Sequence, residues 1–193
     1  GLLWDRHRDF LEKFYDEGTK AKYHLYQPIT LDARDFGVPQ RRKRVFILGV
    51  REPERVRDFQ WPPAATHFPP NKASDGHEIW VSCEHVFRAA SQGDENDIHM
   101  NHGAELVEAF RKTPPNGGSR KDSGRVLPCH REHDGHKDVY GRINPAEPAP
   151  TMTTACINPS KGRFVHPTEH HGITLRQAAR IQTFPDNYEF VGG

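Results

Sequence analysis

Apolar residues and one histidine near the start of the chain recur with a helical period. They fall near i, i+4, i+7, i+8 and i+11 and are Leu3, His7, Phe10, Leu11 and Phe14. This spacing places them on one face of a helix, and Gly18 is a residue type at which helices commonly stop. The pattern predicts an amphipathic helix over residues 3–18.

Two extended segments are predicted after this helix. Residues 23–31 alternate well enough for a strand, although Pro28 restricts it to a sheet edge or a bulge, because proline has no N–H to donate. A turn through residues 37–39 then leads into the apolar run 44–50, which predicts a second strand. A helix, a strand, a turn and a second strand suit the last part of an α/β sheet.

The middle of the chain, from residue 52 to residue 140, lacks the long periodic patterns of the first part. Prolines break it into short pieces, and these are Pro53, Pro62, Pro63, Pro69, Pro70, Pro114, Pro115 and Pro128. One helix is predicted near residues 104–112, and the sequence shows no internal repeat or low-complexity tract. We therefore predict an irregular lobe here.

Regular structure is predicted again towards the end of the sequence. Residues 151–154 and 162–165 read as extended, and a helix begins at Thr174 and ends before Pro185. Its first turn has the arrangement of a capping box, because Gln177 stands three residues after Thr174. One face of this helix is predicted to pack closely and carries Leu175, Ala178, Ala179 and Gln182.

The overall charge does not by itself indicate a nucleic-acid-binding protein. Lysine and arginine number 27 against 26 aspartate and glutamate residues, a formal net charge of +1, so any DNA binding must come from local clusters. One cluster is residues 41–44. A second and looser set is Arg111, Lys112, Arg120, Lys121 and Arg125. Without other evidence, such runs are most often a solvated surface.

Composition limits the core and the compartment. Hydrophobic residues make up 34% of the 193 residues, which predicts a modest core. The three cysteines are an odd number at no regular spacing, so we expect no disulfide framework and a reducing compartment. The sequence has no apolar run near the ~18 residues that cross a bilayer and no signal-peptide pattern at its start. A cytoplasmic location is expected.

Two blocks of residues carry a resemblance to a known family. The arginine block, residues 40–44 (Gln-Arg-Arg-Lys-Arg), is similar to the Gln-x-Arg-x-Arg block of the DNA (cytosine-5)-methyltransferases. Residues 162–167 and 175–186 resemble the carboxy-terminal signature of the same enzymes, in the same order. Because two separate blocks agree, the assignment does not depend on a single short motif.

The resemblance covers only the downstream half of such an enzyme. In the family, a Phe-x-Gly-x-Gly cofactor loop, a Pro-Cys nucleophile block and a Glu-Asn-Val block precede the arginine block, and this sequence contains none of them. The resemblance implies an α/β fold: the end of a methyltransferase-type (Rossmann-like) sheet beside a small, irregular, mixed target recognition lobe. It assigns residues 1–51 to the catalytic domain, 52–154 to the target recognition region and 155–193 to a segment that returns to the catalytic domain.

The family transfers a methyl group from S-adenosylmethionine to C5 of a flipped cytosine in duplex DNA. The resemblance implies that this chain supplies DNA recognition and the arginine block. S-adenosylmethionine is then bound mainly by a missing N-terminal half or a separate subunit, and no metal is expected. We expect the isolated chain to be inactive, with restriction-modification as one setting for the enzyme. The alternative is a non-catalytic DNA-binding or regulatory remnant.

The chemistry of methyl transfer explains why arginines are expected in the arginine block. In the family, a cysteine thiolate adds to C6 and pushes negative charge onto the ring, which a fixed cationic donor stabilises more than it stabilises the ground state. Arginine suits this task because it stays charged and its planar fork holds direction. By position, Arg44 matches the family residue that reaches the cytosine, Arg42 one that supports the site, and Gln40 the turn that holds them. The alternative is that both arginines pair with carboxylates at a sheet edge.

Further residues are expected at the DNA. Arg41 and Lys43 point away from the other two arginines of the block, so they are candidates for phosphate contacts or plain surface charge. Residues 140–154 resemble the end of the family's recognition region. There Arg142 matches an arginine that reads a base and Thr151 a threonine that bonds a phosphate. The alternatives are a surface arginine and a strand threonine.

The later block departs from the family pattern at two positions. His171 stands where many members have an arginine, and Gln177 where they have a glutamate, so a salt bridge built from that pair is in doubt. Arg176 and Arg180 are retained and are expected to organise the junction between lobes.

A cysteine and its neighbouring histidines carry two less favoured interpretations. Pro128-Cys129 resembles the nucleophile block but follows the arginine block instead of preceding it. A zinc site is the other interpretation, because thiolate and imidazole are zinc ligands. Its spacing matches no standard finger, and a polar loop is favoured. The residues concerned are Cys129, His130, His133 and His136.

Overall fold

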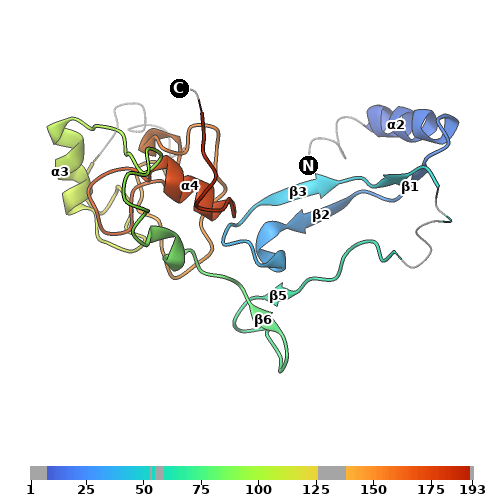
Figure 1. The fold of residues 1–193 in the computed structure, drawn as a ribbon, viewed down its shortest axis with the longest axis horizontal. Coiled ribbons are helices and arrows are strands. Elements are labelled where there is room, and N and C mark those ends of the chain that lie inside the picture. Colours follow the sequence, from blue (N-terminus) through green and yellow to red (C-terminus); the bar gives the residue numbers. More distant parts are fainter. Residues whose placement is uncertain (1–7, 53, 55–58, 126–137, 192–193) are drawn as a thin grey trace. The chain divides into compact units, whose positions relative to one another are not determined.

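A computed structural model describes residues 8–52, 54, 59–125 and 138–191 (Figure 1). The chain divides into two compact units. Unit 1 comprises residues 1–32 and 43–65, and unit 2 comprises residues 33–42 and 66–193. Unit 2 therefore includes a short peptide that lies between the two segments of unit 1 in the sequence. The functional boundaries predicted from the sequence, at residues 51 and 154, stay a prediction.

Unit 1 begins with the helix α2 (Arg8–Lys20). The predicted helix is confirmed from residue 8 onward, whereas its first residues lie outside the described part of the chain. Gly18 does not stop the helix. A Cβ at Gly18 would lie 2.4 Å from Leu25 Cδ1, so this glycine allows the following strand to approach the helix closely. The helix ends two residues later, near Lys22, whose φ of 62° lies in the left-handed region.

Each of the two predicted strands of unit 1 is split into two short pieces. The first gives β1 (His24–Leu25) and β2 (Ile29–Asp32), and the second gives β3 (Lys43–Phe46) and β4 (Gly49–Val50). The antiparallel pairs are β1 with β4 and β2 with β3 (Figure 1). The first break contains Pro28, in agreement with the limit that proline sets on a ladder.

The predicted α/β character is confirmed only at a coarse level. The described residues contain three two-stranded ladders, two of them in unit 1, and no Rossmann-like sheet is seen among them. A parallel sheet requires strands joined by crossover connections, and within unit 1 each strand finds a single antiparallel partner. The expected sheet is therefore not formed by these strands alone.

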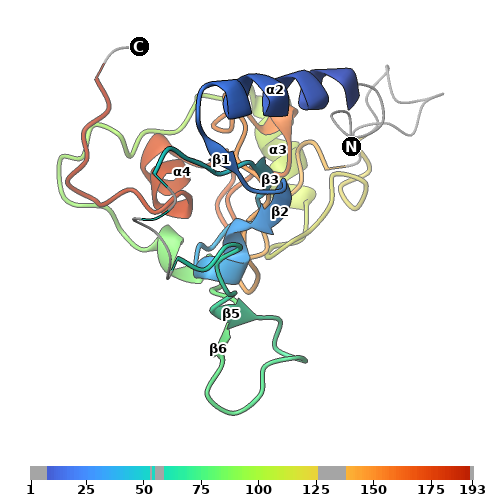
Figure 2. The ribbon, with the colours of Figure 1, turned by 90° about the vertical axis from the view of Figure 1, so that its right-hand side faces the viewer.

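Unit 2 consists mostly of irregular chain around short helices (Figure 2). Its longest helix, α3 (Ala104–Lys112), has the bounds predicted from the sequence. A parallel pair, β5 (His67–Phe68) with β6 (Glu78–Ile79), forms the base of a projecting loop (Figures 1 and 2). The remaining elements are the 3-10 turns η1 (Ala33–Phe36), η3 (Glu84–Phe87) and η5 (Pro159–Lys161) and the helix α4 (Leu175–Ile181).

A hydrophobic core lies within unit 2. Residues distant in sequence build it, and Phe87 packs against it. Its buried members are Cys83, Val86, Ile143, Ala149, Met152, Cys156, Phe164, Ile173, Ala178 and Ile181. The core therefore joins η3, the segment after residue 138 and α4 into one body.

The start of α4 confirms the predicted capping box. Thr174 Oγ1 accepts a hydrogen bond from Gln177 N, and Gln177 Oε1 accepts one from Thr174 N. The predicted packing face is only partly right, because Gln182 is exposed. Burial extends around the helix and includes polar residues, namely Arg176, Gln177, Ala178, Ala179, Arg180 and Ile181.

Two predicted strands are absent from the described structure. Residues 151–154 form no strand, because side chains of the arginine block take up their backbone groups, as described below. In residues 162–165, only Val165 forms bridges, with Arg142 and Gly172. No described helix has the length and apolar character needed to cross a membrane.

Candidate nucleic-acid interface

The arginine block follows a tight turn that the local sequence builds. Residues 33–36 form η1, and Ala33 N donates to Arg42 O at 3.0 Å, which closes the turn. Gly37 has a φ of 82°, a conformation that favours glycine. A Cβ at this position would also lie 2.8 Å from the ring of His67. The turn therefore requires glycine both for its backbone and for space.

Gln40 joins the arginine block to a segment more than a hundred residues away. Its side chain is 1% exposed. Gln40 Oε1 accepts a hydrogen bond from Met152 N at 3.2 Å, and Gln40 Nε2 donates to Ile181 O at 3.5 Å. A buried amide that is bonded on both sides fixes the relative position of its partners. Gln40 therefore connects the turn, the 149–152 segment and the end of α4.

Backbone bonds reinforce this connection, which we call the Gln40 clip. Arg41 N donates to Ala149 O at 2.8 Å, and Ala149 N donates to Pro39 O at 2.9 Å. These two bonds make a parallel bridge between Gln40 and Ala149. The clip consists of residues 39–42 and 149–152.

Arg42 and Thr151 lie together within the clip. Arg42 Nη1 donates to Met152 O at 3.1 Å, and Thr151 Oγ1 donates to Arg41 O. Arg42 is half-buried and Arg41 is exposed. The structure thus brings together, inside unit 2, Gln40, Arg41, Arg42 and Thr151 of the predicted site residues.

Lys43 and Arg44 lie in unit 1, on β3, and both are exposed. Arg44 is paired in register with Leu31, and Arg44 Nη1 donates to Lys43 O at 2.7 Å. Cross-strand partners and residues two apart share a face, so Arg44 shares one with Leu31 and Phe46. Arg44 forms no salt bridge with the described residues.

Arg142 lies in the interior of unit 2 and not at its surface. The residue is 1% exposed. Its guanidinium has five N–H donors, and these donate to four backbone carbonyls and to His170 Nδ1. The carbonyls are those of Phe110, Thr113, His166 and Glu169. This geometry leaves no donor for a base edge, so the base-reading role predicted for Arg142 does not fit the structure, and burial lowers the pKa of this group.

A polar pocket of about 260 Å³ lies beside the clip in unit 2. Arg41 lines it together with two asparagines, and Arg163 is held there by hydrogen bonds to Gly117 O and Asp138 Oδ1. The lining residues are Arg41, Asn116, Gly117, Asn144, Glu147, Pro148, Pro150 and Arg163. Cations and neutral amides beside an arginine-containing turn are suited to contact a polyanion.

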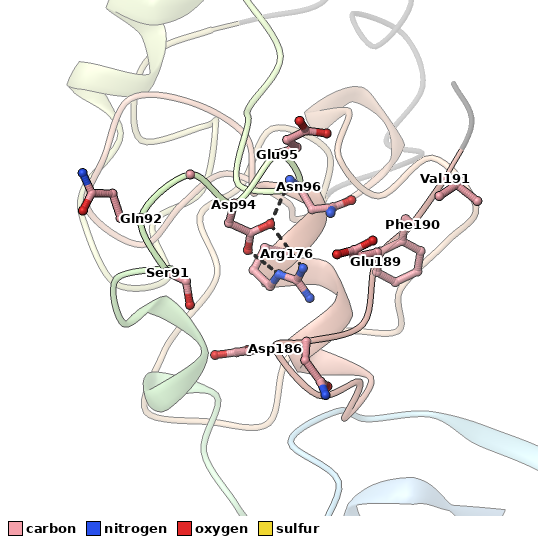
Figure 3. Close-up of a pocket in the computed structure, with 12 residues that line it drawn as sticks. Ser91, Gln92, Asp94, Glu95, Asn96, Arg176, Asp186, Glu189, Phe190 and Val191 are labelled. Atoms are coloured by element: carbon pink, nitrogen blue, oxygen red, sulfur yellow. Dashed lines mark hydrogen bonds and ion pairs between the residues drawn. The ribbon is translucent and has the colours of Figure 1, made fainter.

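Arg176 and Arg180 are buried inside unit 2. Arg176 is 2% exposed, and its Nε and Nη2 donate to the carboxylate of Asp94 at the wall of a pocket of about 530 Å³ (Figure 3). Arg180 donates to the carboxylate of Asp186 and to Val86 O. The hydrogen bond from Arg180 lowers the pKa of Asp186 to about 2. Both arginines therefore tie α4 to loops of its own unit.

The two positions that depart from the family pattern have other partners here. Gln177 completes the capping box described above. His171 stacks on His99 with ring centroids 4.0 Å apart. This histidine contact is not predictable from local sequence, because its members come from segments far apart in the chain. Their only signal in the sequence is the closely spaced group His166, His170 and His171.

The cysteines that the structure describes are not candidate nucleophiles. Cys83 and Cys156 are free and buried, and burial raises the pKa of Cys83 to about 12. A thiol with a raised pKa carries little thiolate at neutral pH. Cys129, with its three neighbouring histidines, lies outside the described residues.

Comparisons with known proteins agree with the motifs. A model of the family described as C-5 cytosine-specific DNA methylase matches residues 1–193. Type II methylase M.HgiDII of Herpetosiphon aurantiacus is 30% identical over 174 residues, covering 88% of this chain and 47% of the relative. Type II methyltransferase M1.BsuMI of Bacillus subtilis (strain 168) is 30% identical over 195 residues, covering 98% and 42%.

A solved structure shares the fold of the chain. It is a prophage-encoded DNA modification methyltransferase from E. coli, with a TM-score of 0.61 and 15% sequence identity, covering 98% of this chain and 58% of that one. At this identity the likeness concerns the fold alone. The chain spans about half the length of the curated relatives it matches.

Proposed function

The chain belongs to the C-5 cytosine-specific DNA methylase family, and from this premise we propose that it supplies the DNA-recognition half of a methyltransferase. The proposed reaction transfers a methyl group from S-adenosylmethionine to C5 of a flipped cytosine in duplex DNA. The Gln40 clip is the observation that carries the proposal, because it holds the arginine block against Thr151 of the recognition segment.

Arg44 is the residue proposed to reach the cytosine. It is exposed, it forms no salt bridge with the described residues, and its Nη1 donates a hydrogen bond to Lys43 O. Its guanidinium therefore keeps donors for a group that comes from outside the chain. Such a donor stabilises the charge that develops on the ring after thiolate addition. Arg42, fixed to Met152 O, is proposed to support this part of the site.

Phosphate contacts are proposed for the cations beside the clip. Arg41 and Lys43 are exposed, and Thr151 lies against the backbone of Arg41. Phosphate contacts position a protein on the duplex, whereas base contacts specify the sequence. Since Arg142 is buried, base reading is assigned to other residues of unit 2.

The remaining functions are assigned to the half of the enzyme that this chain lacks. No Phe-x-Gly-x-Gly loop and no Pro-Cys block precede the arginine block in this sequence, so we assign no residue of this chain to S-adenosylmethionine or to the nucleophile. The isolated chain is therefore proposed to be inactive in methyl transfer.

A second candidate function is DNA binding without methyl transfer. It is favoured by one observation, that unit 2 has a hydrophobic core of its own. A unit that folds around its own core can bind DNA without a catalytic partner.

Reconstitution separates the two candidates. The chain is mixed with the part of M1.BsuMI that it does not match, and transfer of labelled methyl from S-adenosylmethionine to duplex DNA is measured. We expect incorporation that falls by about 10²–10³-fold in Arg44→Ala, the range seen when one charge-stabilising donor is removed. Arg51→Ala, at an exposed arginine of unit 1, is the matched control. DNA binding without incorporation, also with N-terminal halves of other relatives, supports the second candidate.

A further inference from the structure

Five histidines gather in unit 2, away from the Gln40 clip. His99 and His102 precede α3, whereas His166, His170 and His171 precede α4. The rings of His99 and His171 stack, and the His166 and His171 centroids lie 5.3 Å apart. We call these residues the histidine cluster. It joins two segments that are more than sixty residues apart in the sequence.

Three rings of the cluster accept hydrogen bonds from groups that can only donate. His166 Nδ1 accepts from Glu169 N at 3.0 Å, and His102 Nε2 accepts from Gly172 N at 3.1 Å. The third acceptor is His170 Nδ1, which is 3.1 Å from Arg142 Nη2. A backbone amide and a guanidinium have no lone pair to offer, so each of these ring nitrogens must be unprotonated. The geometry therefore requires neutral imidazoles.

The surroundings of the cluster also favour the neutral form. The α3 and η3 helices present aromatic rings to it, with Phe110 against His102 and Phe87 against His166. The pKa of His166 is lowered to about 4, and burial is the main cause. The charges of His171 and Arg142 act in the same direction. Burial also lowers the pKa of His102 and of His171, and their histidine neighbours add to this. The carboxylates that face the cluster and oppose these effects are Asp97 and Glu169.

We propose that the histidine cluster is an acid-sensitive latch, which holds residues 166–172 and the Arg142 guanidinium in place while its rings are neutral and releases them on protonation. A proton on His166 Nδ1 or His102 Nε2 would face the N–H of its present partner, so the hydrogen bond would be lost. Arg142 connects residues 166–170 to the end of α3 through Phe110 O and Thr113 O. Release of the latch therefore loosens the packing of α3 as well.

The direction of the pH effect follows from linkage. Histidines in the unfolded chain bind a proton near pH ~6.5, whereas His166 in the folded chain does so only near 4. The unfolded state thus binds more protons between these values, and stability falls as the pH decreases through this window. The contribution of the latch is complete above about pH 6.5 and disappears towards pH 4.

Hydrogen exchange and melting of the whole chain test the latch. We expect the amides of Glu169 and Gly172 to be protected at about pH 7.5 and to lose at least about tenfold in protection, after correction for intrinsic rates, at about pH 5. The melting temperature should fall by about 5 °C over the same range. In the double variant His102→Gln, His166→Asn, neutral amide oxygens replace the two acceptors, and most of this pH dependence should disappear.

Two comparisons make the result decisive. His85→Gln, at an exposed histidine of η3, should keep the full pH dependence. If the double variant does not fold, the NMR titration of the His166 ring in the unmodified chain replaces it, and we expect that ring to stay neutral at about pH 5. Equal protection at both pH values, amides that are unprotected at neutral pH, or a His166 ring that titrates near ~6.5 would each overturn the proposal. None of these outcomes depends on methyl transfer, so the proposed function is tested separately.

Discussion

Unit 2 encloses a hydrophobic core, whereas unit 1 leaves its large apolar side chains on the surface. Among the described residues, Leu11 is the single buried hydrophobic side chain of unit 1. Its exposed ones are Phe10, Phe14, Tyr23, Val45, Phe46 and Phe59. Unit 2 exposes large apolar side chains as well, so the contrast between the units lies in the buried core and not in the exposed residues. The comparison indicates that the core of unit 2 is built from its own residues, whereas unit 1 buries little apolar surface and is the part for which we propose a covering partner.

Polar side chains show the same contrast. In unit 2, arginines are buried and bonded to backbone carbonyls or carboxylates, as Arg142, Arg176 and Arg180 show. In unit 1, Arg44 is exposed on a strand with apolar neighbours. Buried charges require partners, so unit 2 has a fixed internal architecture, whereas Arg44 of unit 1 is the residue proposed to keep donors for a group outside the chain.

The largest expected effect tests whether unit 2 depends on a polar interior. Arg142→Ala removes the five donors that bond four carbonyls and His170 Nδ1, and of these carbonyls Phe110 O keeps a bond from Thr113 N. We expect the free energy of unfolding to fall by about 4 kcal/mol, because unsatisfied buried groups each cost about 1–3 kcal/mol and the effects overlap. Urea denaturation measures this. Arg111→Ala, on the exposed face of α3, should change stability by less than about 0.5 kcal/mol, and an equal loss in both variants would contradict the expectation.

A pair of truncations compares the two units directly. Ile181 in unit 2 is 0% exposed and Phe46 in unit 1 is 45% exposed. Ile181→Ala should cost about 2–4 kcal/mol of stability, whereas Phe46→Ala should cost less than about 0.5 kcal/mol in the isolated chain. In the reconstituted enzyme, Phe46→Ala should weaken association by about tenfold. Association measured by titration calorimetry that is insensitive to Phe46 would show that this face of unit 1 is not covered by a partner.

The smallest effect concerns the start of α4. Thr174 accepts from Gln177 N and donates to Asp97 Oδ1 at 2.7 Å. Thr174→Ala should lower the free energy of unfolding by about 1–2 kcal/mol, the usual cost of a lost N-cap. Thr174→Ser keeps the hydroxyl and should restore most of the loss in thermal melts. A serine variant as unstable as the alanine variant would assign the effect to the methyl group and not to the cap.

Local features of the fold were accessible from the sequence. The bounds of α3 and the capping box of α4 were predicted, because periodicity and N-cap chemistry act within one or two turns of helix. The break at Pro28 followed from a missing donor. The role of Gly18 was not predicted, because it depends on Leu25, which belongs to the next element.

Long-range features were not accessible in the same way. Arg142 was expected at the surface, since a sequence gives no sign that carbonyls from α3 and residues 166–169 surround it. Residues 151–154 have strand-like composition, but their hydrogen bonds go to Gln40, Arg41 and Arg42. The Rossmann-like sheet was inferred from the family and is not seen among the strands that the structure describes. Such features depend on partners distant in sequence or outside it.

The Gln40 clip has a consequence for dissecting the protein. Residues 33–42 belong to unit 2, although the rest of that unit begins at residue 66. A gene fragment that starts at residue 66 would omit a peptide whose backbone pairs with Ala149 and whose glutamine lies between Met152 and Ile181. A minimal version of unit 2 is therefore discontinuous, and its design calls for residues 33–42 to be joined by a new linker or added as a separate peptide.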